Sequence, residues 1–366
     1  MKEGWEYRKF ESCLVKVPKQ VQVKSKDYKK EGLYPIVSQE TELISGYWDD
    51  ETIVYKHKEP VIVFGDHTKN IKYIDFDFVV GADGTHILST KSDINAKFFY
   101  YVLKSIKLRE LGYARHFKLL KENSIPVPPL SEQQSIVDYL DSSFAKIDAM
   151  KANAEKALNE AKTLFQASLK EMLEPKEGWK EKKIGDVCAI TSLLVNPVEE
   201  QYKKLLHVGG ANIISESGEF VDLKTADEEG LISGKFVFSN EDVLYNKIRP
   251  YLKKVARPDF SGLCSADMYP LRHNQSITRD YLYYVLVTKD FTDYAILNSS
   301  RAGMPKVNRQ AVFAYNFFLP SLSEQQFIVE TLDSLKSKVD RLQENYNKIS
   351  QECDALKQAI LRQVFE

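Results

Sequence analysis

The sequence predicts a mixed α/β protein of the α+β class, built from two copies of one module that each end in a long helix. Three observations support this prediction: an internal repeat, strand-like segments in the first part of each copy, and apolar residues at helical spacing in the last part. The chain has 366 residues, of which 43% are apolar, and this length exceeds what one hydrophobic core usually serves. We therefore expect two globular units.

The internal repeat consists of short blocks that recur in the same order. The block KEGW stands at Lys2 and again at Lys176, and LSEQQ stands at Leu130 and again at Leu322. Between them, three blocks of the first copy have counterparts in the second: EPVIV and EDVLY, Ala82-Asp83 and Ala266-Asp267, FYYVLK and LYYVLV. A tandem duplication explains this order and divides the chain into residues 1–174 and 175–366.

The first part of each copy is expected to hold strands and loops with a few short helices. Segments such as EPVIVFG, FDFVVGAD and FVFSNEDVLYNKI are rich in Val, Ile, Phe and Tyr. They are bounded by Gly, Pro, Asn and Asp, which is typical of strands that end in turns.

The last part of each copy is expected to form one long helix, over Ser131–Leu173 and Ser323–Phe365. Each of these segments opens on a serine followed by Glu-Gln-Gln, which is a typical helix start. Apolar residues then follow at alternating spacings of three and four, which is a heptad pattern. The predicted seam includes Leu140, Ile147, Cys353 and Leu356.

Helices of this length need a partner of similar length. About 43 residues at 1.5 Å each make a helix of roughly 65 Å, which overruns a single domain. We expect the two helices to pair antiparallel about a pseudo-twofold axis as a coiled coil that separates the two mixed domains. The alternative is that each helix lies on its own domain.

These motifs together resemble the specificity subunits of type I DNA restriction-modification systems. The stretches PPLSEQQSIVDYLD and PSLSEQQFIVETLD are similar to the Pro-Leu-x-Glu-Gln-Gln-like opening of that family's conserved helices. The tryptophans of the two KEGW blocks, Trp5 and Trp179, are family-like as well. So are the segments VIVFGDHTKNIKYIDFDFVVGADGT, DVLYNKIRPYLKKV and RAGMPKVN.

The resemblance implies a domain order and a set of partners. Residues 1–129 and 175–321 would be target-recognition domains, and residues 130–174 and 322–366 the conserved helices. The subunit would not itself be catalytic, and it would read double-stranded DNA with two half-sites. It would bind two methyltransferase subunits, and restriction subunits that translocate DNA would be added for cleavage.

The residues themselves give no sign of catalysis or of a cofactor. The sequence has no GxxxxGK[ST] loop, and the nearest string to an Asn/Asp-Pro-Pro-aromatic motif is Asn196-Pro197-Val198. No histidines stand at metal-ligand spacing, so we expect no metal and no cofactor. The four dispersed cysteines indicate buried thiols, and without a long apolar run we expect a cytoplasmic protein that does not contact a membrane.

Contacts with DNA must come from local patches, because the net charge is −1. Arg reads guanine edges with paired hydrogen bonds, whereas Lys neutralises phosphates. In the second copy, two basic segments supply the candidate DNA-binding residues Lys247, Arg249, Tyr251, Lys253, Lys254, Arg301, Lys306, Asn308 and Arg309. In the first copy, the candidates are His67, Lys69, Asn70, Lys72, Arg115, His116 and Lys118.

Other interpretations of the same residues remain open. The basic segments can equally be solvated loops, and the stretch from Lys16 to Lys30, with its six lysines, is a less specific candidate for phosphate contacts. Two other classes of protein also fit parts of the sequence. One is a coiled-coil assembly or inhibitory protein that does not read DNA, and the other is a DNA-modifying enzyme. The target bases do not follow from the sequence.

Overall fold

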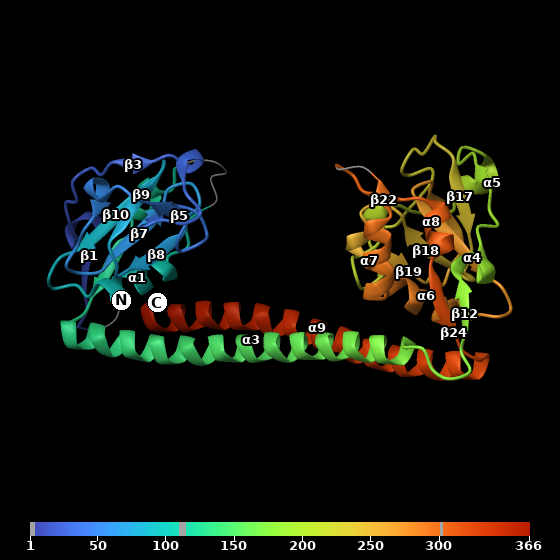
Figure 1. The fold of residues 1–366 in the computed structure, drawn as a ribbon. Helices are drawn as coiled ribbons and strands as arrows, with labels where there is room; N and C mark the ends of the chain where they lie inside the picture. Colours follow the sequence, from blue (N-terminus) through green and yellow to red (C-terminus); the bar gives the residue numbers. More distant parts are fainter. Residues whose placement is uncertain (1–3, 110–114, 301–302) are drawn as a thin grey trace. The chain divides into compact units, whose positions relative to one another are not determined.

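Both expected long helices are present. In the computed structural model, α3 spans Leu130–Leu173 and α9 spans Leu322–Phe365 (Figure 1). The structure describes residues 4–109, 115–300 and 303–366. The chain folds into two compact units, unit 1 with residues 1–155 and 345–366, and unit 2 with residues 156–344. Each unit therefore contains a mixed domain and a part of both long helices.

Within each unit the two helices run antiparallel. In unit 1, the Cys353 thiol donates to the carbonyl of Ile147 at 3.7 Å, and the Lys151 ammonium lies 3.7 Å from the Asp354 carboxylate. In unit 2, Lys162 donates to the side chain of Gln343 at 2.8 Å. The predicted antiparallel pairing is confirmed.

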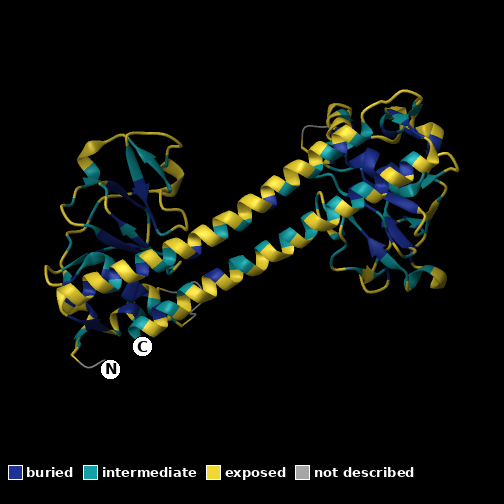
Figure 2. Ribbon diagram, turned by 90° about the horizontal axis from the view of Figure 1, so that it is seen from below, coloured by how far each residue is buried: buried dark blue, intermediate teal, exposed yellow. Residues whose placement is uncertain are grey.

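The seam between the helices differs from the prediction at Leu356. Ile147 and Cys353 are buried as expected, but Leu356 is 47% exposed. A straight helix drifts by about 20° per heptad, so its contact face shifts along a heptad pattern. From Cys353 the contact face continues through Lys357, which pairs with Asp148, to buried Leu361. Figure 2 shows that most of both helices is exposed outside this face.

Each unit contains a four-stranded antiparallel sheet of the same order, β2-β10-β7-β8 in unit 1 and β13-β21-β18-β19 in unit 2. In unit 1 these are β2 (Leu14–Val15), β10 (Thr85–Thr90), β7 (Val61–Gly65) and β8 (Ile71–Ile74). In unit 2 they are β13 (Cys188–Ala189), β21 (Met268–His273), β18 (Asp242–Asn246) and β19 (Val255–Ala256). The sheets match because the sequence is duplicated.

A second, five-stranded sheet packs against the first in each unit. In unit 1 it has the order β3-β9-β4-β5, with β6 also paired to β9, and in unit 2 the order is β14-β17-β20-β15-β16. The unit 1 strands are β3 (Gln22–Val23), β4 (Tyr34–Val37), β5 (Gly46–Trp48), β6 (Val54–Tyr55) and β9 (Phe78–Gly81). The unit 2 strands are β14 (Leu194–Val195), β15 (Leu206–Val208), β16 (Lys224–Thr225), β17 (Lys235–Phe238) and β20 (Gly262–Ser265).

Short helices and two-stranded pairs complete the domains. The α-helices are α1 (Ala96–Ser105), α2 (Phe117–Lys121), α4 (Ile184–Val187), α5 (Glu200–Lys203), α6 (Arg279–Val287), α7 (Lys289–Leu297) and α8 (Arg309–Ala314). The pairs are β1 (Glu6–Lys9) with β11 (Ser124–Val127), β12 (Lys180–Lys183) with β24 (Asn316–Leu319), and β22 (Ser299–Ser300) with β23 (Lys306–Val307). The 3-10 helices span Phe10–Cys13, Ser25–Asp27, Glu51–Ile53, Gly210–Asn212 and Pro250–Leu252.

One of the two inner strands of each four-stranded sheet, β7 in unit 1 and β18 in unit 2, is buried on both faces. In β7, Val61 and Val63 join the core between the two sheets, while Ile62 and Phe64 join the core with α1 and the long helices. In β18, Leu244 belongs to the core between the two sheets. Its neighbours Val243 and Tyr245 belong to the core with α6 and the long helices. This two-sided burial explains why both segments are continuous apolar runs.

The first glutamine of each LSEQQ block fixes the start of a long helix. Gln133 is fully buried; its Oε1 accepts from the backbone N–H of Asn95 at 2.8 Å, and its Nε2 donates to the carbonyls of Asp93 and Pro128. Gln325 is also fully buried and makes the equivalent bonds to the backbone of Thr278, Ser276 and Pro320. A buried amide of this kind must have every partner satisfied.

A tyrosine and a cation hold each domain to its helix. Tyr101 donates to Asp141 on α3 at 2.5 Å, and Lys97 lies 2.7 Å from the same carboxylate. In unit 2, Tyr284 donates to Asp333 on α9 at 2.5 Å, and Arg257 lies 2.8 Å from it. Burial and the adjacent carboxylate raise the pKa of both tyrosines, so each remains a hydrogen-bond donor at neutral pH.

The cysteines agree with a further expectation. All four cysteines are buried and free of disulfides, as predicted. Over the described ranges, no helix is both long and apolar enough to cross a membrane.

We predict that Gln325→Ala lowers the free energy of unfolding of unit 2 by about 1 to 3 kcal/mol, because the buried Thr278 N–H and two carbonyls lose their partners. The matched control is Gln326→Ala, since Gln326 is exposed and donates to the exposed Glu330 one turn away. Urea denaturation of both variants measures the difference. Equal midpoints for the two variants would contradict the role given to Gln325.

Candidate nucleic-acid interface

Each unit brings its two predicted basic segments together at the same place in the fold. In unit 1, the turn from β7 to β8 meets the start of α2. In unit 2, the loop from β18 to β19 meets β23 and the start of α8. We call these surfaces site 1, residues 66–70 with 115–118, and site 2, residues 247–254 with 303–309.

Backbone pairing joins the two segments of site 2. The N–H of Arg249 donates to the carbonyl of Pro305 at 2.8 Å, and the N–H of Val307 donates to that of Lys247 at 3.1 Å. Ile248 and Lys306 form an antiparallel β-bridge between them. Main-chain hydrogen bonds therefore hold the loop independently of its side chains.

Site 2 presents arginines and an aromatic side chain to solvent. Arg249 and Arg309 are exposed, and Tyr251 is 50% exposed. Arg249 and Lys253 have φ values of 50° and 47°, in the left-handed region that costs a residue with a side chain about 1 kcal/mol or more. Such strain is kept where the surrounding structure dictates the backbone, so the Cα–Cβ bonds of both residues leave the loop in fixed directions.

The remaining polar residues of site 2 have structural partners. Lys247 is largely buried, donates to the carbonyl of Ala266 at 2.6 Å, and has its pKa lowered by that burial. Lys254 donates to the carbonyl of Gly210, and Asn308 caps α8 by accepting from the N–H of Ala311 at 2.8 Å. Arg301 lies outside the described residues.

A buried carboxylate joins the two segments of site 1. Asp66 is 4% exposed, and its Oδ1 accepts from the N–H of Phe117 at 2.8 Å. Its Oδ2 lies 3.4 Å from His86 Nε2 and 4.0 Å from Arg115 Nε, and its carbonyl accepts from the N–H of His116. The start of α2 is thus tied to the end of β7.

A loop that sequence analysis did not single out supports the turn of site 1. The backbone carbonyl of Gln39 accepts from Thr68 Oγ1 at 2.5 Å and from Asn70 Nδ2 at 2.9 Å. The side-chain Oε1 of Gln39 accepts from the N–H of His67. A Cβ at Gly65 would stand 2.4 Å from Thr68 Oγ1 and 2.7 Å from Gln39 Cβ. Only glycine permits this close approach. The glycine that ends the VIVFG run was the one sequence signal for this contact.

Site 1 exposes fewer candidates than the sequence suggested. The Arg115 side chain is 82% exposed, Lys118 is exposed, and His67 and Lys69 are partly exposed. Lys69 adopts a left-handed φ of 58° in the turn.

Lys72 and His116 are corrections to the expected set. Lys72 is 6% exposed and donates to the carbonyl of Glu42, and burial lowers its pKa. His116 is 1% exposed, with Nδ1 3.0 Å from the carbonyl of Asp66. Neither side chain reaches the surface, so both support the site rather than face a ligand.

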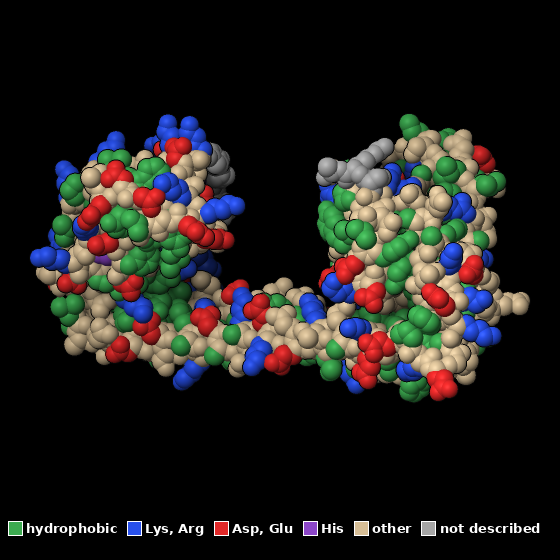
Figure 3. All heavy atoms as spheres, in the orientation of Figure 1, with side chains coloured by type: hydrophobic (Ala, Val, Ile, Leu, Met, Phe, Trp, Pro, Cys, Tyr) green, Lys and Arg blue, Asp and Glu red, His purple; other side chains and the backbone are tan. Residues whose placement is uncertain are grey.

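Figure 3 shows Lys and Arg side chains at the end of unit 1 that carries β3. All six lysines from Lys16 to Lys30 are exposed, and one of them, Lys29, pairs with Asp49 at 2.6 Å. This stretch therefore remains a candidate for phosphate contacts.

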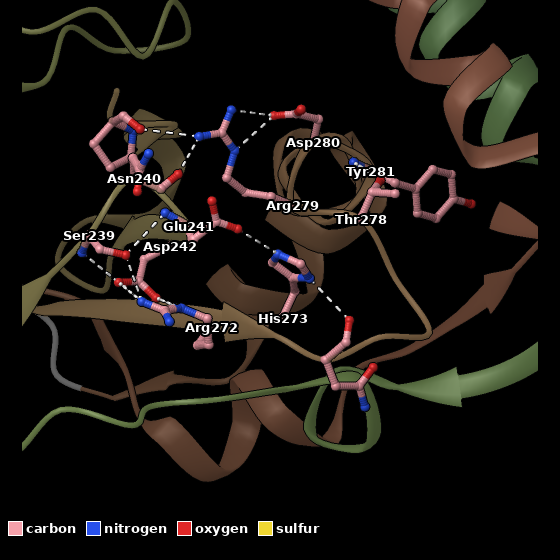
Figure 4. A network of polar contacts seen from close by, with 12 residues as sticks. Ser239, Asn240, Glu241, Asp242, Arg272, His273, Thr278, Arg279, Asp280 and Tyr281 are labelled. Atoms are coloured by element: carbon pink, nitrogen blue, oxygen red, sulfur yellow. Dashed lines mark hydrogen bonds and ion pairs between the residues drawn. The ribbon is translucent and has the colours of Figure 1, made fainter. Parts of the chain in front are cut away.

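A polar network fixes the other end of β18, away from site 2 (Figure 4). Arg272 lies 2.6 Å from Asp242 and donates to Ser239, and Arg279 contacts Asp280 and the carbonyl of Asn240. Both arginines therefore have protein partners at or next to the start of β18 and help to hold this strand in place. Over the described ranges, no group of three or more His, Cys, Asp or Glu side chains is arranged to hold a metal ion.

The fold and its duplicated basic site define a class, the DNA specificity proteins of type I restriction-modification systems. The chain belongs to the family described as the type I restriction modification DNA specificity domain, whose model matches residues 2–160 and again residues 176–351. It serves as the DNA-recognition subunit of such a system. The resemblance seen in the sequence is thereby confirmed.

Named relatives and solved structures agree with this family. The chain is 28% identical to the type I restriction enzyme EcoDI specificity subunit of Escherichia coli over 74% of this chain and 70% of that one. It is 23% identical to the EcoR124I/EcoR124II specificity subunit of Escherichia coli over 89% of this chain and 85% of that one. A chain from a type I restriction-modification complex matches at 17% identity and a TM-score of 0.70, covering 100% of this chain and 98% of that one. The HsdS subunit of Thermoanaerobacter tengcongensis matches at 18% identity and a TM-score of 0.51, covering 100% of this chain and 97% of that one. At these identities the structural matches show a shared fold.

We predict that Asp66→Ala loosens site 1 locally, because the buried N–H of Phe117 loses its acceptor at a cost of about 1 to 3 kcal/mol. Amide hydrogen exchange should become faster over residues 66–70 and 115–121, while site 2 keeps its parental rates. The control is Asp83→Ala, since Asp83 is exposed. Unchanged exchange in α2 of the Asp66 variant would show that the carboxylate does not hold this site together.

Proposed function

We propose that each unit reads one half-site of a bipartite double-stranded DNA target, through site 1 in unit 1 and site 2 in unit 2. The recognition domains are then residues 1–129 and 175–321, and the conserved helices are residues 130–174 and 322–366. The observation that carries this proposal is the recurrence of one arrangement in both units: exposed cations gather where the turn after the doubly buried strand meets the segment that starts a short helix.

The exposed side chains of both sites suit DNA. Arg115, Arg249 and Arg309 are exposed, and a guanidinium donates two parallel hydrogen bonds to the O6 and N7 of guanine. Lysines such as Lys69, Lys118 and Lys253 suit phosphates, which orient the protein without reading sequence. Backbone bonds hold the loops before binding, so less conformational entropy is lost on DNA contact.

We infer that the chemistry is supplied by partner subunits. The sequence carries no recognisable cofactor loop or catalytic motif. The relatives are named as specificity subunits of restriction enzymes, which supports work within a complex of several subunits. We propose that its partners are two methyltransferase subunits and restriction subunits that translocate DNA. The chain would then act without a cofactor of its own, in the cytoplasm where DNA is the substrate.

The proposal is tested with the chain assembled with its methyltransferase subunits. Arg249→Ala and Arg309→Ala should each weaken specific binding by about 1 to 3 kcal/mol and relax preference within one half-site, whereas Arg115→Ala should affect the other half-site. Lys118→Ala should weaken binding evenly across sequences and reduce the salt slope by about one. Electrophoretic shifts at several salt concentrations give these values.

The control is Arg341→Ala, because Arg341 is an exposed arginine on α9 outside both sites. Equal effects of this variant and the site variants would contradict the proposal. Methyl transfer by the purified chain alone would show a DNA-modifying enzyme. A complex that assembles but does not bind DNA would show an assembly or inhibitory protein.

A further inference from the structure

One carboxylate lies among the cations of site 2. Asp267 Oδ1 lies 2.8 Å from the ammonium of Lys306 and 3.6 Å from that of Lys247. The carbonyl of Asp267 also accepts from the N–H of Lys247 at 3.2 Å. Asp267 is therefore part of the surface formed by the two basic segments, although it follows a different strand, β20.

The Asp267 carboxylate is partly open to solvent. The ion pair of each lysine with it is made at Oδ1. The Asp267 side chain is 50% exposed, whereas Lys247 is 15% exposed and Lys306 is 38% exposed. The carboxylate is thus more exposed than either lysine that pairs with it, which leaves it accessible as an acceptor.

The carboxylate is ionised at neutral pH. Burial raises the pKa of Asp267, but the adjacent ammonium groups of Lys306 and Lys247 lower it by more, so the net pKa lies below the usual value. In its ionised form Asp267 accepts hydrogen bonds and donates none.

A negatively charged acceptor distinguishes the hydrogen-bond acceptors of DNA, which it repels, from the donors, which it binds. It repels phosphates and the O6 or O4 carbonyls of guanine and thymine, and it accepts from exocyclic amino groups, such as N4 of cytosine and N6 of adenine. A base that offers no N–H leaves the carboxylate desolvated and without a partner, which penalises the wrong sequence.

We propose that Asp267 is a specificity-determining residue of site 2, which accepts a hydrogen bond from an exocyclic amino group of a target base. Lys247 and Lys306 are positioning residues that orient the carboxylate. This inference rests on the proposed function, because it assumes that site 2 faces base edges.

Among the described residues of unit 1, neither the carboxylate at the centre of site 1 nor the counterpart of Asp267 in the repeat is an equivalent acceptor, so we expect the loss of discrimination in one half-site only. Asp66, the carboxylate at the centre of site 1, is 4% exposed and has protein donors near both oxygens. Asp83, which corresponds to Asp267 in the repeat, is exposed and has no cation paired with it among the described residues. The two sites share their framework and differ in this group.

The test uses Asp267→Asn in the assembled complex, with bound sequences selected from a random library. Asparagine keeps the size of the side chain and both donates and accepts. We expect one position of the site 2 half-site to lose discrimination by about tenfold or more, with the other half-site unchanged. Affinity for random DNA should rise several-fold and depend more steeply on salt, since one negative charge is lost from the basic surface.

The matched control is Asp227→Asn, because Asp227 is an exposed aspartate of unit 2 that lies 3.8 Å from Lys204. Its selected sequences should equal those of the parent. The same thermal midpoint for both variants and the parent shows that folding is intact, and Asp267→Ala serves as a second variant that removes the acceptor entirely.

Three outcomes separate this inference from the proposed function. If Asp267→Asn and Asp267→Ala keep the parental sequence preference while Arg249→Ala changes it, the role of Asp267 is wrong and the DNA-reading function stands. If the Asp267 variants weaken all sequences evenly, the carboxylate only positions the lysines, which also overturns the inference. If the parental complex selects no sequence, the proposed function itself fails.

Discussion

The candidate sites depend on one strand in each unit that is buried on both faces. Strand β7 contributes alternate side chains to the inter-sheet core and to the core with the long helices, and β18 does the same in unit 2. A strand packed on both sides cannot shift its register without moving its side chains between two cores. The turn that follows each strand therefore starts from a fixed point.

Polar contacts anchor the start of each long helix to its own domain. The buried amides of Gln133 and Gln325 satisfy backbone groups at the loop before α1 or α6 and at the exit from the domain. Asp141 and Asp333, further along each helix, accept from a tyrosine of the same domain. Since an unsatisfied buried polar group is costly, these contacts favour one orientation of the helix start on its own domain.

Features that local patterns encode could be predicted from the sequence. The repeated LSEQQ block and the heptad spacing located both helices, and the clustered charges located both basic segments of each unit. Contacts that arise only when distant segments meet could not be predicted in this way. The burial of Lys72 depends on the loop that carries Glu42, about thirty residues away, so no pattern around Lys72 could reveal it.

Asp267 shows the same limit. The Ala266-Asp267 block is visible in the internal repeat, but the role of Asp267 depends on the approach of Lys306 from another strand. Gln39 likewise acts through a turn that precedes β8 rather than through its own neighbours. Pairing in space was predictable for the helices, because two long amphipathic faces have few alternatives, and was not predictable for loops.

The central claim is that the two units use equivalent surfaces on DNA, and amide hydrogen exchange of the assembled complex tests it most directly. The exchange is measured with and without the DNA target selected for that complex. We expect slower exchange on DNA binding at both equivalent surfaces, residues 66–70 with 115–118 and residues 247–254 with 303–309. Protection confined to one unit, or to the long helices while both surfaces keep their rates, would contradict it.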